Sequence, residues 1–242
     1  MRYRAKFLAL EGIDGAGKRT QLNLLVRLLA KGRVPHARIS FPKYKSFFGR
    51  MVGRFLNGEF GPLEAVDPHF SALLFAGDRL EAKAELEAAL NAGKVVLADR
   101  YIGSNLAHQT ARMPPRRRRK FLAWLRELEY GVFGLPRETL VIYLRVPVRV
   151  AHRLVGRKAA RAYTRRERDL QEADLAHLIQ AAQVYEQLAR GANWATVDCT
   201  DRRTGALLAP EEIHRAVVAT IERRAPQLLR AQQAAPLQTV RR

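Results

Sequence analysis

The sequence has almost no cysteine: Cys199 is the single one in 242 residues. One thiol excludes an internal disulfide framework and a metal site built from several cysteines. Such cysteine usage is typical of a reducing compartment. We therefore expect the protein to be cytoplasmic.

Long hydrophobic runs are also missing. The apolar stretch near the N-terminus reaches only Leu10 before Glu11 and Gly12 interrupt it, which is too short for the core of a signal peptide. No run reaches the roughly 18 apolar residues that a membrane-spanning helix needs. Hydrophobic residues still make up 48% of the chain. This content predicts a soluble protein with one large core and no membrane partner.

Acidic residues are scarce relative to basic ones, 23 against 43, which gives a formal net charge of +20. This balance favours nucleic-acid binding, but enzymes that handle nucleotide phosphates also concentrate arginine. Part of the excess lies in two peripheral segments, Arg116–Lys120 and Arg241–Arg242. The basic stretches lack interleaved aromatic residues and the chain shows no recognisable nucleic-acid module. Nucleic-acid binding therefore stands as the alternative interpretation.

Short apolar runs alternate with helical patterns along the chain. The predicted strands are residues 6–10, 37–41, 95–98, 140–144 and 194–197, and the predicted helical segments are 21–29, 67–91, 148–154 and 175–188. Asp67 followed by Pro68 predicts a helix cap and a first helical residue. The alternation predicts an α/β fold with a parallel sheet.

Three segments depart from this alternation. Residues 113–120 combine prolines with a basic run and predict the solvated start of a helix. Residues 156–168 are dense in Arg and Lys and contain no Leu, Ile or Val, which is typical of a surface loop over an anionic ligand. The chain beyond residue 224 is rich in Ala, Gln and Arg. We predict a single domain over residues 1–224 and a basic, flexible tail over residues 225–242.

A phosphate-binding loop follows the first predicted strand and precedes the first predicted helix. Gly12–Lys18 matches G-x-x-x-x-G-K in the context that this motif requires. Its glycines let backbone N–H groups turn toward phosphate oxygens, the helix N-terminus adds partial positive charge, and Lys18 reaches the outer phosphates. The predicted ATP-binding residues are Gly12, Gly15, Ala16, Gly17, Lys18, Arg19 and Thr20.

The loop departs from the motif at the residue after Lys18. Arg19 stands where a Ser or Thr normally ligates Mg²⁺, and Thr20 comes one place later. We therefore expect Mg²⁺ to be held by nucleotide phosphates, water and carboxylates such as Asp99 or Asp14. A carboxylate inside the loop repels phosphate unless a metal or a substrate hydroxyl lies between them, so Asp14 is a candidate for either contact. Its alternative role is to cap a turn.

Four segments together resemble thymidylate kinase. They are Leu10–Lys18, Phe41–Tyr44, Leu74–Arg79 and Asp99–Tyr101, the last followed by Ser104 and Asn105, and their order and separations fit over about residues 6–200. The resemblance implies transfer of the γ-phosphoryl group of ATP to dTMP, with Mg²⁺ as cofactor. It also implies a P-loop NTPase fold with a five-stranded parallel sheet flanked by helices, a mobile lid and a homodimer. The alternatives are another nucleotide or deoxynucleoside kinase and a nucleic-acid-binding P-loop ATPase.

The resemblance also assigns the base of the acceptor nucleotide. It implies that Phe75 stacks on the thymine ring, that Arg79 bonds the ring edge and that Asn105 lies against the base. An aromatic face and a guanidinium group suit these contacts. For Phe75 alone, a place in the core is the alternative.

The sugar and phosphate receive their own set of residues. The resemblance implies that Arg100 holds the dTMP phosphate, that Asp99 orients Mg²⁺ or the phosphate, and that Tyr44 lies near the sugar and phosphate. His108 occupies a place where several bacterial relatives carry a tyrosine next to the sugar. A solvent-facing helical histidine is the alternative.

Residues 153–168 resemble the lid that closes over ATP in this family. Because Gly15 replaces an arginine in the phosphate loop, the sequence is similar to the bacterial type, in which lid arginines stabilise the transferring phosphoryl group. Arg157 is the first candidate and Arg153 the second, with Arg161 and Arg166 as further candidates. Asp169 and Glu172 align near the end of the lid, where relatives contact the substrate or order the lid. An arginine in this role contributes about 10³ to 10⁵ in rate. The predicted catalytic set is Lys18, Arg157, Arg153, Asp14 and Asp99, and a solvated basic loop is the alternative for the lid.

Overall fold

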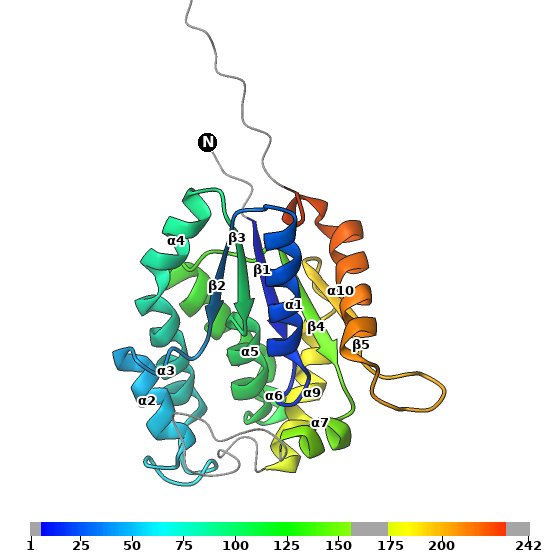
Figure 1. Ribbon diagram of the computed structural model, residues 1–242. Coiled ribbons are helices and arrows are strands. Elements are labelled where there is room, and N and C mark those ends of the chain that lie inside the picture. The colour runs from blue at the N-terminus through cyan, green and yellow to red at the C-terminus, as the bar shows by residue number, and fades with distance from the viewer. Residues whose placement is uncertain (1–5, 156–173, 231–242) are drawn as a thin grey trace, which may run out of the picture.

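A computed structural model describes residues 6–155 and 174–230. Within these residues, one sheet contains β1 (Phe7–Glu11), β2 (His36–Ser40), β3 (Val95–Asp99), β4 (Leu140–Arg145) and β5 (Trp194–Asp198). Its strand order is β2-β3-β1-β4-β5 and every neighbouring pair is parallel (Figure 1). The predicted α/β fold with a five-stranded parallel sheet is confirmed.

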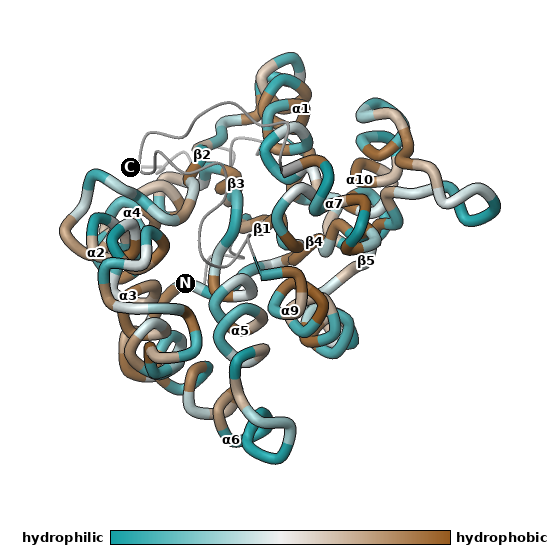
Figure 2. Tube along the Cα trace, turned by 90° about the horizontal axis from the view of Figure 1, so that it is seen from below, coloured by the Kyte–Doolittle hydropathy of each residue, from teal (hydrophilic) through white to brown (hydrophobic). Residues whose placement is uncertain are grey.

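Helices flank the sheet on both faces. They are α1 (Lys18–Lys31), α2 (Phe47–Leu56), α3 (Pro68–Glu81), α4 (Lys83–Asn91), α5 (Ile102–Ala111), α6 (Pro115–Arg126), α7 (Val148–Val155), α9 (Leu175–Leu188) and α10 (Pro210–Arg224), with a π-helical turn η1 (Glu127–Val132) and a 3₁₀ turn η2 (Pro226–Leu228). Seen from below in Figure 2, α1 and α10 cover one face, and α5 and α9 cover the other. No helix among the described residues is long and apolar enough to cross a membrane.

The strand sequences follow from burial on both faces. All five residues of β1 are buried, as are the first five of β4, so apolar residues replace the alternation of a half-exposed strand. The strands point downward in Figure 1, and their carboxyl ends lie on the side of α2 and α7. Parallel sheets bind ligands at this edge.

The helical segment predicted for residues 67–91 is two helices. Asp67 caps α3 by accepting the His69 backbone N–H at 2.6 Å, and Pro68 is the first helical residue, as predicted. The chain then breaks at Ala82, which ends α3 and precedes α4. The break lets two short helices follow the edge of the sheet.

A second, smaller core supports the region around α2 and α3. It consists of buried apolar side chains packed with partly buried aromatic ones: Val52, Phe55, Leu56, Leu63, Val66 and Leu74, with Tyr44, Phe48, Met51, Phe60 and Phe75. The main core lies between the sheet and its helices. The second core therefore anchors Tyr44 and Phe75 apart from the sheet.

The segment after α10 differs from the predicted tail in its first residues. Ala225 and Leu228 are almost fully buried and belong to the main core, and η2 lies between α10 and residue 230. The expectation of a flexible segment is wrong for residues 225–230, because Leu228 has apolar surface to bury. The remaining residues 231–242 lie outside the described part of the chain.

A buried carboxyl group predicts a specific pH dependence of stability. Glu138 accepts the Tyr130 hydroxyl at 2.7 Å, and burial raises the pKa of Glu138 to about 7. Because the unfolded chain ionises near pH 4.3, this group contributes stability at acid pH that is lost as the pH rises through about 7. Glu138→Gln should remove that loss and raise the free energy of unfolding at pH 8, relative to pH 5, by about 3 kcal/mol. Denaturant unfolding at both pH values measures the change.

The exposed Glu222→Gln is the matched control, since its side chain faces solvent on α10. Equal pH responses of the two variants would contradict the raised pKa of Glu138.

Candidate active site

A cavity of about 310 Å³ lies at the carboxyl edge of the sheet. Its lining comes from the phosphate loop, α1, β2, the segment after β2, α2, α3, β3, the residue after β3 and α5. The lining residues are Asp14, Arg19, Arg38, Ser40, Phe41, Pro42, Tyr44, Leu56, Phe75, Arg79, Asp99, Arg100, Ser104, Asn105, His108 and Gln109. Every residue predicted to contact the acceptor nucleotide therefore lies on this one cavity.

The phosphate loop has the backbone that its glycines permit. Gly12, Gly15 and Gly17 all have positive φ, at 145°, 87° and 83°. The Lys18 ammonium group donates to the carbonyl oxygens of Gly12 and Ile13 at 2.8 and 2.9 Å. These contacts hold the ammonium group inside the curve of the loop.

Helix α7 packs directly against this loop. A Cβ atom at Gly15 would lie 2.2 Å from the carbonyl oxygen of Ala151. No side chain fits at position 15 unless α7 moves.

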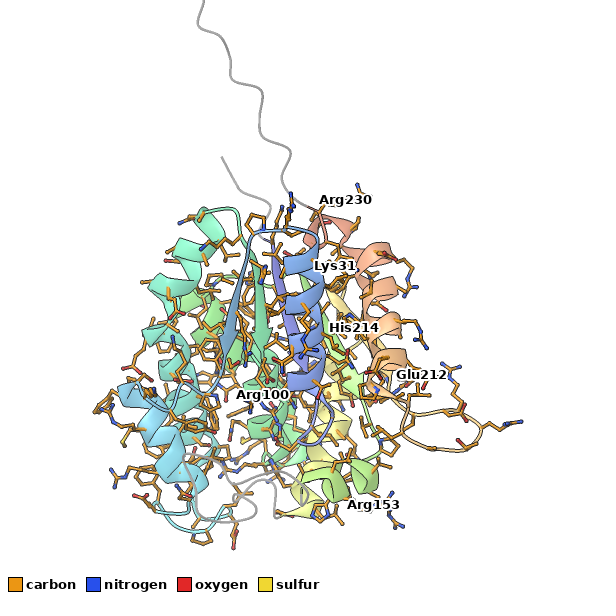
Figure 3. All side chains as sticks on the ribbon, in the orientation of Figure 1. Lys31, Arg100, Arg153, Glu212, His214 and Arg230 are labelled. Atoms are coloured by element: carbon orange, nitrogen blue, oxygen red, sulfur yellow. The ribbon has the colours of Figure 1, made fainter. Side chains whose placement is uncertain are left out.

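Arg100 lines the cavity beside the phosphate loop. It follows β3 with φ of 66°, a conformation that is rare for a residue with a side chain and that turns the chain into α5. Its guanidinium group donates to Asp14 Oδ1 at 2.6 Å, to Ser104 Oγ at 2.9 Å and to the Gly12 carbonyl at 3.2 Å. Burial alone would lower the pKa of Arg100, but Asp14 and other neighbouring groups raise it well above its usual value. Figure 3 shows Arg100 in the centre of the molecule.

A buried carboxylate that the sequence did not reveal holds this part of the site together. Glu11 is fully buried and accepts hydrogen bonds from Tyr101 N at 2.7 Å, Ser104 Oγ at 2.6 Å and Tyr185 Oη at 3.0 Å. Burial raises the pKa of Glu11. Gly103 is needed beside it, because a Cβ there would lie 2.9 Å from the carboxylate. Glu11 therefore joins β1 to α5 and α9.

Other lining residues are the aromatic ring of Phe75 and the polar side chains of Arg79 and Asn105. Phe75 packs edge-on against Phe55, with 6.2 Å between ring centroids and an angle of 88°, and also lines the cavity. Arg79 donates through Nε and Nη2 to Glu129 at 2.6 and 2.7 Å, and Asn105 donates to the same carboxylate at 2.8 Å. Glu129 is a second buried carboxylate that sequence reasoning missed.

His108 is buried rather than solvent-facing. Its Nδ1 lies 3.2 Å from Nε2 of His177 on α9. Burial, together with the charge of Arg100, lowers the pKa of His108, and burial lowers the pKa of His177 to about 4. Both rings are therefore neutral at pH 7.

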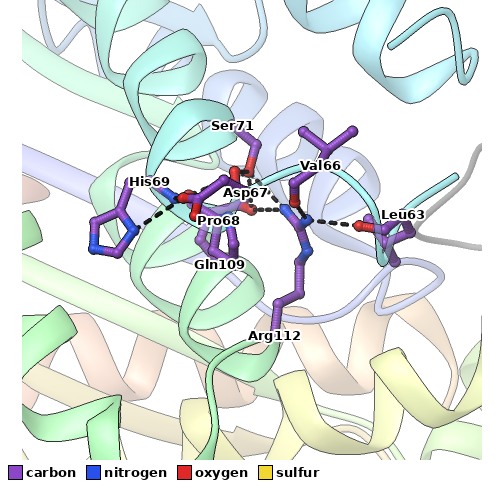
Figure 4. A network of polar contacts seen from close by, with 8 residues as sticks. All are labelled: Leu63, Val66, Asp67, Pro68, His69, Ser71, Gln109 and Arg112. Carbon is purple, nitrogen blue, oxygen red and sulfur yellow. Dashed lines mark hydrogen bonds and ion pairs between the residues drawn. The ribbon is translucent and has the colours of Figure 1, made fainter. Parts of the chain in front are cut away.

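Gln109 is fixed from behind by Arg112. The Arg112 guanidinium donates to Gln109 Oε1 at 3.0 Å, to Ser71 Oγ at 2.6 Å and to the carbonyl oxygens of Leu63 and Val66 (Figure 4). Burial lowers the pKa of Arg112 to about 10, so it stays charged at pH 7. The loop before α3 and the Gln109 amide are thus held by one cation.

Three of the buried polar side-chain atoms without a partner in the described structure belong to residues that line the cavity. Asn105 Oδ1, His108 Nε2 and Gln109 Nε2 have no hydrogen-bond partner, and all three residues line the cavity. Buried polar groups are normally paired. Their grouping on α5 marks the positions where a ligand supplies the missing bonds.

The other predicted site residues line the cavity, lie exposed on the surface, or fall outside the described residues. Asp99, Tyr44 and Arg19 line the cavity, whereas Thr20 is exposed and is not among the lining residues. Arg153 is exposed on α7 and lies at the outer edge of the molecule in Figure 3. Three predicted lid arginines, Arg157, Arg161 and Arg166, lie outside the described residues, as do Asp169 and Glu172 near the end of the lid. The described residues contain no group of three His, Cys, Asp or Glu side chains able to hold a metal ion.

A glycine-lined phosphate loop beside a polar and aromatic cavity is typical of a P-loop phosphotransferase. The family model described as Thymidylate kinase matches residues 10–206. The chain belongs to the thymidylate kinase family.

Individual relatives agree with this assignment. Thymidylate kinase of Mycobacterium tuberculosis is 33% identical over 213 residues, which cover 85% of this chain and 98% of that protein. Thymidylate kinase of Thermomicrobium roseum is 34% identical over 218 residues, covering 89% and 93%. A solved structure of thymidylate kinase from Candida albicans has a TM-score of 0.72 over 94% of both chains. At 19% identity, that structure supports the fold alone.

The contact between α7 and the phosphate loop can be tested with two glycines of matching backbone conformation. Gly15 and Gly17 have φ of 87° and 83°, but a Cβ at Gly17 meets nothing within 4 Å. Gly17→Ala should lower the free energy of unfolding by about 1 kcal/mol through backbone strain. Gly15→Ala should lower it by about 1–3 kcal/mol more, because α7 has to move. Denaturant unfolding without nucleotide measures both, and equal losses would show that α7 does not crowd the loop.

Proposed function

We propose that the protein transfers the γ-phosphoryl group of ATP to dTMP, giving dTDP and ADP. One observation carries the proposal. A single cavity has Phe75, Arg79 and Asn105 at one end and Arg100 beside the phosphate loop at the other. A pyrimidine monophosphate bound with its ring at the first end brings its phosphate to the loop that holds ATP.

At the acceptor site, Arg100 exchanges one anion for another. Its bond to Asp14 gives way to the dTMP phosphate, which offers a bidentate partner of higher charge. Phe75 stacks on the base, and Arg79 and Asn105 bond its edge. Tyr44 and His108 lie along the same cavity and contact the sugar. His108 Nε2 suits a hydroxyl, because a hydroxyl both donates and accepts.

At the ATP site, the loop amides and Lys18 bind the phosphates. Asp14 and Asp99 line the cavity, and two carboxylates suit Mg²⁺, which keeps several waters and binds substrate phosphates. Both would hold the ion, and Mg²⁺ supplies positive charge to the phosphoryl oxygens when bound. Phosphoryl transfer needs positioning and such charge more than covalent chemistry. Arg157 and Arg153 are the proposed arginines of the transition state, in keeping with the lack of room for a side chain at Gly15.

A homodimer is part of the proposal. Phe70, Leu73 and Leu80 are exposed on one side of α3, and Phe47 is exposed at the start of α2. Exposed apolar side chains at helical spacing are typical of a helix face that packs against a partner. We also place the enzyme in the cytoplasm, which fits a single, buried cysteine. No feature of the cavity favours nucleic acid over a mononucleotide.

A coupled ADP-release assay with ATP and Mg²⁺ tests the function against dTMP, dUMP, dCMP, dGMP, UMP and AMP. We expect dTMP to have the highest kcat/KM. Lys18→Met, purified in the same way, controls for contaminating kinases and should be inactive. No turnover with any acceptor, together with ATP hydrolysis stimulated by polynucleotide, would overturn the proposal.

The stacking role of Phe75 can be separated from its packing role. Phe75→Leu keeps apolar contact with Phe55 but loses the aromatic face, whereas Phe75→Tyr keeps both. Because stacking contributes about 1–3 kcal/mol per base, Phe75→Leu should raise the KM for dTMP by about 10-fold or more and leave the KM for ATP unchanged. Phe75→Tyr should stay near wild type. Steady-state kinetics with each substrate varied checks this, and an unchanged KM for dTMP in Phe75→Leu would remove Phe75 from the base site.

A further inference from the structure

Glu129 lies behind the base end of the cavity and is not one of its lining residues. It belongs to η1, a π-helical turn, and is fully buried. Its two oxygens accept three hydrogen bonds, from Arg79 Nε at 2.6 Å, Arg79 Nη2 at 2.7 Å and Asn105 Nδ2 at 2.8 Å. Arg79 and Asn105 are themselves 2% exposed. The proposed function described above assigns no role to Glu129.

The amide of Asn105 can take only one orientation beside Glu129. Its Nδ2 donates to the Glu129 carboxylate and, at 3.0 Å, to the carbonyl oxygen of Ala72. Both partners are acceptors only, so the NH₂ group has to face them whichever way the amide is first drawn. Oδ1 is then left without a partner, on a residue that lines the cavity. Toward a ligand, Asn105 is therefore an acceptor.

The guanidinium of Arg79 is fixed in the same way. Glu129 takes its Nε and one Nη2 hydrogen, which leaves Nη1 and the other Nη2 hydrogen for the cavity that Arg79 lines. Burial alone would lower the pKa of Arg79, but the Glu129 carboxylate raises it above its usual value. Toward a ligand, Arg79 is only a donor. One carboxylate thus sets an acceptor and a donor side by side.

We propose that Glu129 is the positioning residue that sets base specificity at the acceptor site. An acceptor next to donors complements a 4-oxopyrimidine, whose N3–H donates and whose O4 accepts. Cytosine presents the opposite pattern, with N3 as acceptor and an amino group as donor, and meets two mismatched contacts. Glu129 therefore selects thymine or uracil over cytosine without touching the base. This inference rests on the proposed function, because it concerns the same acceptor site.

Glu129→Gln is the direct test. A glutamine has one acceptor oxygen for three donors, so its NH₂ group has to oppose either Arg79 or Asn105, and the Asn105 amide loses its reason to keep Nδ2 toward residue 129. Wild type and variant are assayed as full chains for kcat/KM with dTMP and with dCMP, using dCMP as a competitive inhibitor of dTMP where its turnover is too slow. The ratio is independent of how much enzyme is folded. We expect the dTMP-to-dCMP ratio to fall about 10-fold or more, mainly through a higher KM for dTMP.

Glu138→Gln is the matched control. Glu138 is also buried and lies nine residues further along the chain, but it bonds the Tyr130 hydroxyl and does not line the cavity. The dTMP-to-dCMP ratio of Glu138→Gln should equal that of wild type. Glu129→Asp is the second variant in case Glu129→Gln does not fold, since it keeps a charge for Arg79 but withdraws the carboxylate by one methylene. The dTMP-to-dCMP ratio of Glu129→Asp should also fall, by a smaller factor than that of Glu129→Gln.

The outcomes separate this inference from the function on which it rests. A wild-type ratio in folded Glu129→Gln, or in Glu129→Asp where only that variant folds, overturns the role of Glu129 while dTMP turnover by wild type still supports the kinase. An equal fall in Glu138→Gln also overturns it, because any buried carboxylate would then serve. Absence of dTMP turnover by wild type overturns both.

Discussion

Two arginines buried at the two ends of one cavity constrain the rest of this site. The guanidinium groups of Arg79 and Arg100 carry positive charge, and each is buried beside a carboxylate that compensates it. Arg79 requires Glu129, and Arg100 requires Asp14, with Glu11 close behind. The elements that carry these carboxylates are thereby fixed: η1 at the base end, and β1 with its phosphate loop at the other. The two ion pairs thus lie at different parts of the cavity wall or directly behind it.

The two pairs differ in their access to solvent, and this difference suits their tasks. The Arg79 and Glu129 side chains are 2% and 0% exposed, whereas those of Arg100 and Asp14 are 16% and 19% exposed. Breaking a dry pair by removing one partner costs about 3–5 kcal/mol, so Arg79 keeps its partner in every state of the enzyme. Arg100 borders the open cavity and can replace Asp14 by a phosphate at little net cost. In the proposed function, the dry pair suits a rigid base end, and the more exposed pair suits an end that exchanges anions as substrate enters and product leaves.

The sequence carried the local features of this fold because each depends on neighbours in the chain. Strands β1 and β4 are apolar throughout since both of their faces are covered, and Asp67 caps α3 through the next two residues. The phosphate loop is equally local. Glu11 and Glu129 could not be found in this way, because a lone glutamate in a sequence is typical of the surface, and Glu129 meets Arg79 across 50 residues. Phe75 packs on the second core and also lines the cavity, so its place in the core leaves the predicted stacking on a base possible.

For the same reason, the sequence of α5 alone does not predict whether its polar side chains offer a hydrogen-bond donor or an acceptor. Asn105, His108 and Gln109 each present one unpartnered polar atom at the cavity, and an amide or an imidazole can present either a donor or an acceptor. The orientation of each amide depends on a residue from another part of the fold or the end of the helix. Glu129 of η1 orients Asn105, and Arg112 orients Gln109. For His108 the partner is His177 of α9, a second neutral ring, so the shared proton can sit on either side. In the proposed site, Asn105 and Gln109 therefore have a fixed hydrogen-bond polarity toward a ligand, whereas the polarity of His108 can change with the ligand.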